Sequence, residues 1–144
     1  MIRILAVGKL KDRRLADLVA DYQRRIRPHA RLQIIELRDQ DPGREGRQIL
    51  DQLGPAGGTT PVLALDERGE ALGSHDLAAI LGRHGSLTFV LGGPDGLTDA
   101  VRQRADRVVR LSSLTLTHEW ARALLCEQIY RGLSILRGLP YHRD

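Results

Sequence analysis

The sequence predicts an α/β protein whose mostly parallel sheet lies in a three-layer α/β/α sandwich. Short apolar runs alternate with segments of helical period along the whole chain, and parallel strands need helical crossovers of this kind. The run at residues 61–65 (PVLAL) is apolar at almost every position. Such a run is typical of a strand buried on both faces, as strands of parallel sheets are.

In the first third of the chain, residues 2–7 and 32–37 read as strands. Between them, apolar side chains recur at helical spacing, which predicts an amphipathic helix that Pro28 closes. These side chains are Leu15, Leu18, Val19, Tyr22 and Ile26. The polar face of this helix carries Arg13, Arg14, Arg24 and Arg25. A solvated face and an RNA-facing patch are both open interpretations of these arginines.

In the middle third, residues 38–46 are polar and contain Pro42 and Gly43, so we expect a surface loop there. Residues 45–53 predict a short helix, which residues 54–58 (GPAGG) break. The strand at 61–65 is expected to end in a turn at residues 66–69 (DERG). Ser74 is a plausible N-cap for the next helix, because its hydroxyl can accept from a free backbone N–H.

In the last third, residues 87–91 and 107–111 predict strands, and Thr98 is expected to cap a short helix between them. The final helix runs from about residue 118 to 136, where Gly138 and Pro140 end it. Residues 141–144 form a short tail. We find no repeat or linker, so residues 1–144 are expected to form a single domain.

The composition limits the class of protein. The 144 residues include one cysteine, Cys126, and start without a signal peptide or a run long enough to span a bilayer. We therefore expect a cytoplasmic protein without a membrane partner or a disulfide. The net charge of +4 permits a polyanionic partner. Aromatic residues make up only 3%, which disfavours a base-stacking platform.

Two loops that follow predicted strands are the strongest candidates for a binding site. Residues 92–97 (GGPDGL) follow one strand, and residues 112–117 (SSLTLT) follow another. Ligands of open α/β sheets bind at the carboxyl ends of strands. Neither loop matches a phosphate loop or a dinucleotide fingerprint, and neither carries a basic residue. Together they suit an adenosine-containing ligand, although a tight structural turn and helix caps are the alternative interpretations.

The remaining chemistry-bearing residues show no arrangement of metal ligands, so we expect no metal site. His29, His75 and His84 are expected at the surface, and Cys126 in the core of the last helix. His118 and Glu119 read as polar residues of a helix start, and Glu127 with Arg131 as an exposed ion pair. The tail offers a stacking ring, a titratable ring and a phosphate-binding fork in Tyr141, His142 and Arg143, although disorder is the usual state of a chain end.

Several ordered motifs resemble the ribosomal RNA large-subunit methyltransferase H family over the whole chain. They are residues 7–11 (VGKLK), 63–69 (LALDERG), 91–97 (LGGPDGL), 111–118 (LSSLTLTH), 121–122 (AR), 127–131 (EQIYR) and 140–143 (PYHR). Two places depart from the family pattern. Residues 38–47 look shorter and poorer in lysine than usual, and Glu119 stands where a neutral residue is more common.

The resemblance implies a fold of the SPOUT class with a C-terminal trefoil knot. It also implies a homodimer that uses S-adenosylmethionine to methylate N3 of a pseudouridine in 23S ribosomal RNA within the ribosome. By motif match, the cofactor pocket would be lined by Leu65, Gly92, Leu111, Ser112, Ser113, Leu114, Thr115 and Leu116. The tail residues Tyr141, His142 and Arg143 would reach toward the target base, at the partner subunit's site.

In this reaction the target N3 must lose a proton, so His142 is a candidate base or orienting group, and no metal is required. Two rival hypotheses come from other classes. One is a non-catalytic ribosome- or RNA-binding module that uses the arginine-rich first helix. The other is a nucleotide-binding protein with a small-molecule substrate.

Overall fold

The structure, a computed structural model, describes all 144 residues and contains one sheet of five strands. The strands are β1 (Ile2–Val7), β2 (Leu32–Leu37), β3 (Val62–Ala71), β4 (Leu87–Leu91) and β5 (Arg107–Arg110). Their order across the sheet is β2-β1-β4-β3-β5, and all four neighbouring pairs are parallel. The predicted parallel sheet is therefore confirmed, and the carboxyl ends of all five strands meet at one edge.

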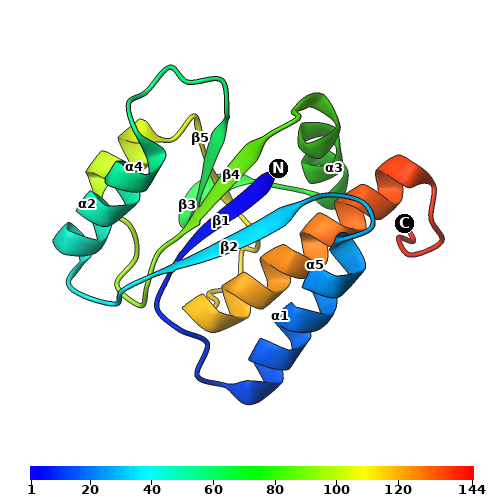
Figure 1. Ribbon diagram of the computed structural model, residues 1–144, viewed down its shortest axis with the longest axis horizontal. Helices are drawn as coiled ribbons and strands as arrows, with labels where there is room; N and C mark the ends of the chain where they lie inside the picture. Colours follow the sequence, from blue (N-terminus) through cyan, green and yellow to red (C-terminus); the bar gives the residue numbers. More distant parts are fainter.

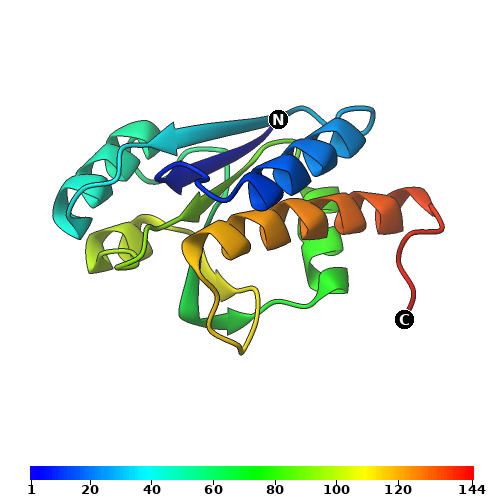
Figure 2. The same ribbon diagram turned by 90° about the horizontal axis from the view of Figure 1, so that it is seen from below.

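Helices cover both faces of this sheet, as the sandwich prediction requires (Figures 1 and 2). The helices are α1 (Arg13–Ile26), α2 (Pro42–Leu53), α3 (Ser74–Arg83), α4 (Asp99–Arg104) and α5 (His118–Arg137). Helices α1, α3 and α5 pack together on one face, and α2 packs with α4 on the other. The trefoil knot stays a prediction.

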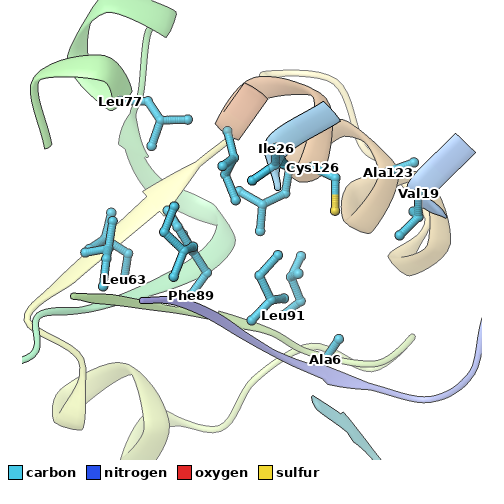
Figure 3. Close-up of a cluster of buried hydrophobic side chains, with 14 of the residues drawn as sticks. Ala6, Val19, Ile26, Leu63, Leu77, Phe89, Leu91, Ala123 and Cys126 are labelled. Carbon is cyan, nitrogen blue, oxygen red and sulfur yellow. The ribbon is translucent and has the colours of Figure 1, made fainter. Parts of the chain in front are cut away.

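Two apolar cores lie between these layers. The larger core joins the sheet to α1, α3 and α5, and Figure 3 shows Leu63, Phe89 and Leu91 of the sheet facing Cys126 of α5. The smaller core contains Leu5 and Val90 from the opposite face of the sheet, with side chains of α2 and α4. The central strand β4 is buried along its entire length, which explains its apolar sequence. Cys126 of α5 is fully buried, which confirms it as a core residue.

Two predicted boundaries in the middle of the chain are wrong. Helix α2 starts at Pro42, three residues before the predicted start, because Asp41 caps it by accepting from the Arg44 N–H and proline fits the first helical turn. Strand β3 does not end at residue 65 but continues to Ala71. The predicted turn at 66–69 is a bulge, across which the pairing with Val109 shifts from Leu65 to Glu70.

The N-cap of α3 is also one residue earlier than expected. Gly73 occupies the cap position, and its N–H donates to Asp76. Ser74 is the first helical residue, and its hydroxyl donates instead to Gln128 of α5 at 2.7 Å. This contact helps to join α3 to α5. None of the helices is long and apolar enough to cross a membrane.

Candidate functional site

A cavity of about 810 Å³ opens at the carboxyl edge of the sheet, beside the adjacent strands β4, β3 and β5. Its walls are the loop after β4, the bulge of β3, the loop after β5 and the first turn of α5. This is the volume of a typical small-molecule site, and the carboxyl edge is where open α/β sheets hold ligands.

The structure brings together most of the residues predicted to bind the cofactor. Seven of the eight line the cavity: Leu65, Gly92, Leu111, Ser112, Leu114, Thr115 and Leu116. Ser113 does not line it and is exposed. Sequence reasoning missed the bulge residue Asp66 and the α5 residue Glu119, which also line the cavity. Both residues lie in or beside motifs that the sequence shows, but only the fold places them against the two loops that line the cavity.

The glycine loop after β4 is a tight turn whose backbone packs closely on itself, because its glycines carry no side chains. The Gly96 N–H donates to the Gly93 carbonyl at 3.0 Å, and Gly96 has a φ of +79°. A Cβ on Gly92 would lie 2.9 Å from the carbonyl carbon of Gly96. The loop therefore needs glycine at position 92 for its own packing, and it leaves its backbone close to the cavity.

The loop after β5 offers backbone groups that no other part of the chain uses. Leu114 N–H donates to Ser112 Oγ at 2.9 Å, whereas the amides of Ser113, Thr115 and Leu116 make no hydrogen bond. Leu65, Leu91 and Leu116 supply apolar surface beside them. Free amides next to apolar side chains suit a ligand with a heterocyclic ring and polar edges, so the residues fit an adenosine-containing molecule.

Asp66 fixes the β3 side of the cavity. Its side chain is 7% exposed and pairs with Arg102 of α4 at 3.0 Å, while the Arg68 N–H donates to its Oδ1 at 2.8 Å. Burial raises the pKa of Asp66, but the Arg68 N–H and the Arg102 guanidinium lower it by more, so the net pKa lies below the ordinary value. The carboxylate therefore stays charged and holds the bulge to α4.

The first turn of α5 contacts the loop after β1 rather than only capping its own helix. Glu119 Oε1 accepts from the backbone N–H of Lys11 at 2.6 Å and of Asp12 at 3.0 Å. The Asp12 N–H is the main reason that the pKa of Glu119 lies below its ordinary value. Glu119 thus joins the first turn of α5 to the loop after β1.

The tail lies far from the cavity in the same chain. The cavity contains the start of α5, and the tail follows its end at Arg137 (Figures 1 and 2). The tail contacts Arg131 through His142, and the helical segment from His118 to Arg131 spans about 20 Å at 1.5 Å per residue. Tyr141, His142 and Arg143 therefore do not line the cavity of their own chain.

A network on the side of α5 holds the tail instead. The Tyr141 hydroxyl donates to Glu127 Oε1 at 2.9 Å and lies 2.9 Å from the hydroxyl of Tyr22 on α1. The ring of Tyr141 meets that of Tyr130 edge-on at 4.8 Å, and the Arg131 guanidinium lies 4.8 Å from its centre. Burial and both hydrogen bonds raise the pKa of Tyr141.

Two predictions near this network need correction. Glu127 and Arg131 do form an ion pair at 2.8 Å, but both side chains are largely covered, because the tail packs on them. His29 is half-buried against Tyr130, whereas His75 and His84 are exposed as predicted. In both cases the covering residues are distant in sequence.

His75, His142 and Asp144 come together at the tail, with possible ligand atoms within 4.8 Å of one another. Sequence reasoning missed this cluster, because His75 belongs to α3. Arg131 donates to His142 Nδ1 at 3.0 Å, so the proton of a neutral ring sits on Nε2 and is donated to Asp144 at 2.8 Å. His75 Nε2 also approaches Asp144 at 2.8 Å. The cluster is a hydrogen-bonded chain, in which His142 has no lone pair free for a metal.

Two carboxylates pair with three of the four arginines on the polar face of α1. Arg14 pairs with Asp12 at 2.9 Å, and Arg24 and Arg25 both pair with Asp21. Arg13 alone of the four makes no ion pair. A patch of four free arginines is therefore not present.

The sheet and its helices define an α/β protein with a cavity at the ends of adjacent strands. The family model described as predicted SPOUT methyltransferase matches residues 1–142. A protein of Syntrophotalea carbinolica named ribosomal RNA large subunit methyltransferase H is 43% identical over 98% of this chain and 97% of its own. One of the same name from Desulfovibrio desulfuricans is 44% identical over 98% of this chain and 96% of its own.

A solved structure is also similar. The crystal structure of a probable methyltransferase from Bordetella pertussis Tohama I matches with a TM-score of 0.55, covering 92% of this chain and 95% of that chain at 14% identity. That likeness shows the fold. The chain belongs to the SPOUT methyltransferase family.

Proposed function

We propose that this protein transfers a methyl group from S-adenosylmethionine to N3 of a pseudouridine in 23S ribosomal RNA. The observation that carries the proposal is the cavity between two uncharged, amide-rich loops, in a chain that belongs to the SPOUT methyltransferase family. The relatives that match nearly the whole chain are named for ribosomal RNA methylation. The positive net charge agrees with an RNA substrate.

In this proposal the two loops hold the methyl donor. S-adenosylmethionine supplies a methyl group already activated by a sulfonium, so the protein need only align donor and acceptor. The free amides of the loop after β5 would bind the polar edges of the cofactor, and Leu65 with Leu116 would contact its ring. The glycine loop would approach the cofactor with its backbone, because Gly92 and Gly96 carry no side chain.

A homodimer would bring the tail to the site. Each chain carries a cavity at one end of α5 and a tail at the other. A two-fold axis near the middle of α5 would set the tail of each subunit beside the cavity of its partner. Large apolar side chains are exposed on the same helices, with Trp120 at 55% and Leu136 at 47% on α5 and Leu18 at 37% on α1. A second copy would cover them.

His142 would then act on the target base, as base or orienting group, with Tyr141 and Arg143 positioning the RNA. Both ring nitrogens of His142 are engaged, one by Arg131 and one by Asp144. To take the N3 proton, the ring would have to exchange one of these contacts for the substrate. Its side chain is only 16% exposed, so this exchange would also have to uncover the ring.

Three measurements test this proposal. Calorimetry with S-adenosylmethionine should show one binding site per chain. Mass spectrometry should show that ribosomal RNA from a strain lacking this protein has lost one methyl group on a pseudouridine. His142→Ala should lower turnover on ribosomes by at least a hundredfold, as removal of a general base does. Absence of cofactor binding would refute the donor site, and full turnover by the His142 variant would remove its role.

Mixed dimers test the shared site. A subunit disabled in the cavity by Gly92→Ala is combined with one disabled in the tail by His142→Ala. If cavity and tail come from different subunits, the mixture should regain activity through dimers that carry one intact composite site. A mixture as inactive as either variant, or light scattering that shows a monomer, would contradict the composite site.

A further inference from the structure

The loop between β1 and α1 carries the only two lysines of the chain, Lys9 and Lys11. Both are exposed, as is Arg13, the first residue of α1. None of the three makes an ion pair, whereas the neighbouring Arg14 is paired with Asp12. We define residues 8–13 as the basic turn. It presents three free cations within six residues, at the carboxyl edge of the sheet where the cavity opens.

The first turn of α5 holds the basic turn from two sides. Glu119 Oε1 accepts from the backbone N–H of Lys11 and Asp12, at 2.6 and 3.0 Å. One helical turn further on, the Arg122 guanidinium donates to the Gly8 carbonyl at 2.8 Å and pairs with Glu36 of β2 at 2.5 Å. The Arg122 side chain is 2% exposed. The two contacts fix both ends of the segment that carries the lysines.

The same helical turn belongs to the cavity wall. His118 and Glu119 line the cavity, and a Cβ on Gly8 would lie 3.8 Å from His118 Nε2. The loop after β5 runs directly into this turn, with Thr117 as the N-cap of α5. The basic turn is therefore hydrogen-bonded to the helical turn that directly follows the loop after β5, although about a hundred residues separate them in sequence.

We propose that the basic turn binds phosphates of the substrate RNA beside the cavity, and that Glu119 is the positioning residue that holds it there. The inference rests on the proposed function and adds the surface by which the RNA is held. Free lysines act as compact point charges for phosphate, and their backbone is already held by hydrogen bonds, so little backbone entropy is lost on binding. The paired arginines of α1 would first have to leave Asp12 or Asp21.

The first test compares two double variants with the same loss of charge. Lys9→Gln with Lys11→Gln removes the lysines, and Arg3→Gln with Arg47→Gln removes two arginines that form no ion pair and lie on the α2 side of the sheet, away from α1 and α5. Ribosome methylation is measured from low to high salt. We expect the lysine variant to raise KM about tenfold at moderate salt and to lower the slope of log KM against log salt by about 1 to 2, since each phosphate contact contributes nearly one unit.

The control variant should change KM much less and leave the salt slope close to that of the wild type. Equal effects of the two double variants would overturn the inference, because net charge alone would then explain the loss. Light scattering and calorimetry with S-adenosylmethionine on each variant show that fold, assembly and cofactor site are intact. If the wild type itself binds no cofactor or methylates no ribosomes, the proposed function fails rather than this inference.

The second test asks whether Glu119 acts through the lysines. Glu119→Ala removes the acceptor of both N–H groups, whereas Glu119→Gln keeps an oxygen at that place. We expect Glu119→Ala to raise KM and lower the salt slope, and Glu119→Gln to restore most of both. In the background of the two lysine substitutions, Glu119→Ala should add little. An equal loss in both backgrounds, or an unchanged salt slope, would overturn the positioning role.

Discussion

The hydroxyl of Tyr141 donates a 2.9 Å hydrogen bond to Oε1 of Glu127, and this bond docks the tail on the side of α5 in the same chain. Glu127 also accepts two bonds from Arg131, at 3.1 and 2.8 Å, so its carboxylate organises both the helix surface and the tail. The chain end is therefore ordered by side chains of α1 and α5, far from the cavity at the start of α5.

Tyr141→Phe should lower the free energy of unfolding by about 1–2 kcal/mol, because it removes two hydrogen bonds of a partly buried hydroxyl. Urea denaturation at neutral pH measures this. Tyr130→Phe is the matched control, since the Tyr130 ring packs on Tyr141 but its hydroxyl makes no hydrogen bond. Equal stability of wild type and Tyr141→Phe would show that the tail is not docked in this way.

Gly92→Ala should weaken binding of S-adenosylmethionine by tenfold or more. The new methyl would lie 2.9 Å from Gly96 carbon and 3.0 Å from Leu97 Cδ2, and relieving such overpacking costs about 1–3 kcal/mol. Calorimetry measures the affinity. Gly85→Ala is the control, because a Cβ there meets nothing within 4 Å. Unchanged affinity in Gly92→Ala would mean that the glycine loop does not contact the cofactor.

Asp66→Asn should destabilise the protein by about 1–3 kcal/mol at pH 7, because Arg102 loses its covered partner. The pKa of Asp66 is lower in the folded state than its ordinary value of 3.8. Its contribution is therefore fully present above pH 3.8 and is lost as the pH falls through the folded pKa. Urea denaturation at pH 7 and near pH 3 measures the difference between variant and wild type, which should shrink in acid.

Asp99→Asn provides the comparison for Asp66. Asp99 binds the same Arg102, but its side chain is 85% exposed, so its loss should cost less than about 1 kcal/mol. If both variants lose the same stability, the covered Asp66–Arg102 pair contributes no more to the free energy of unfolding than the exposed Asp99–Arg102 pair. If Asp66→Asn keeps its full deficit in acid, ionisation of Asp66 is not the cause.

Cys126 should not react with a thiol reagent in the native protein at pH 8. Burial raises the pKa of its thiol to about 12, and the side chain is not exposed, so both the thiolate fraction and the access are low. Colour release from an aromatic disulfide reagent measures the rate. The same protein in urea is the control and should react at once. Fast reaction in the native state would show that α5 opens readily.

Much of this protein could be predicted from residue patterns, because those patterns are local. The alternation of apolar strands and amphipathic helices predicts the parallel sandwich, and Gly92 and Ser112 mark loops by glycine content and hydroxyl density. Seven of the eight predicted pocket residues line the cavity, because strand ends in a parallel sheet lie at one edge. Where prediction erred, at Pro42 and at residues 66–69, a cap and a bulge decided the outcome through particular hydrogen bonds and strand pairing.

The tertiary structure alone decided which distant residues meet. Glu119 reads as an ordinary helix-start residue, yet it binds the backbone of Lys11, 108 positions away. The sequence shows which chemical groups the tail residues carry, but only their docking on Glu127 and Tyr22 places them along the second half of α5, away from the cavity at its start. Local propensity depends on neighbours in sequence, whereas these contacts depend on how the packed helices α1, α3 and α5 bring separate segments together.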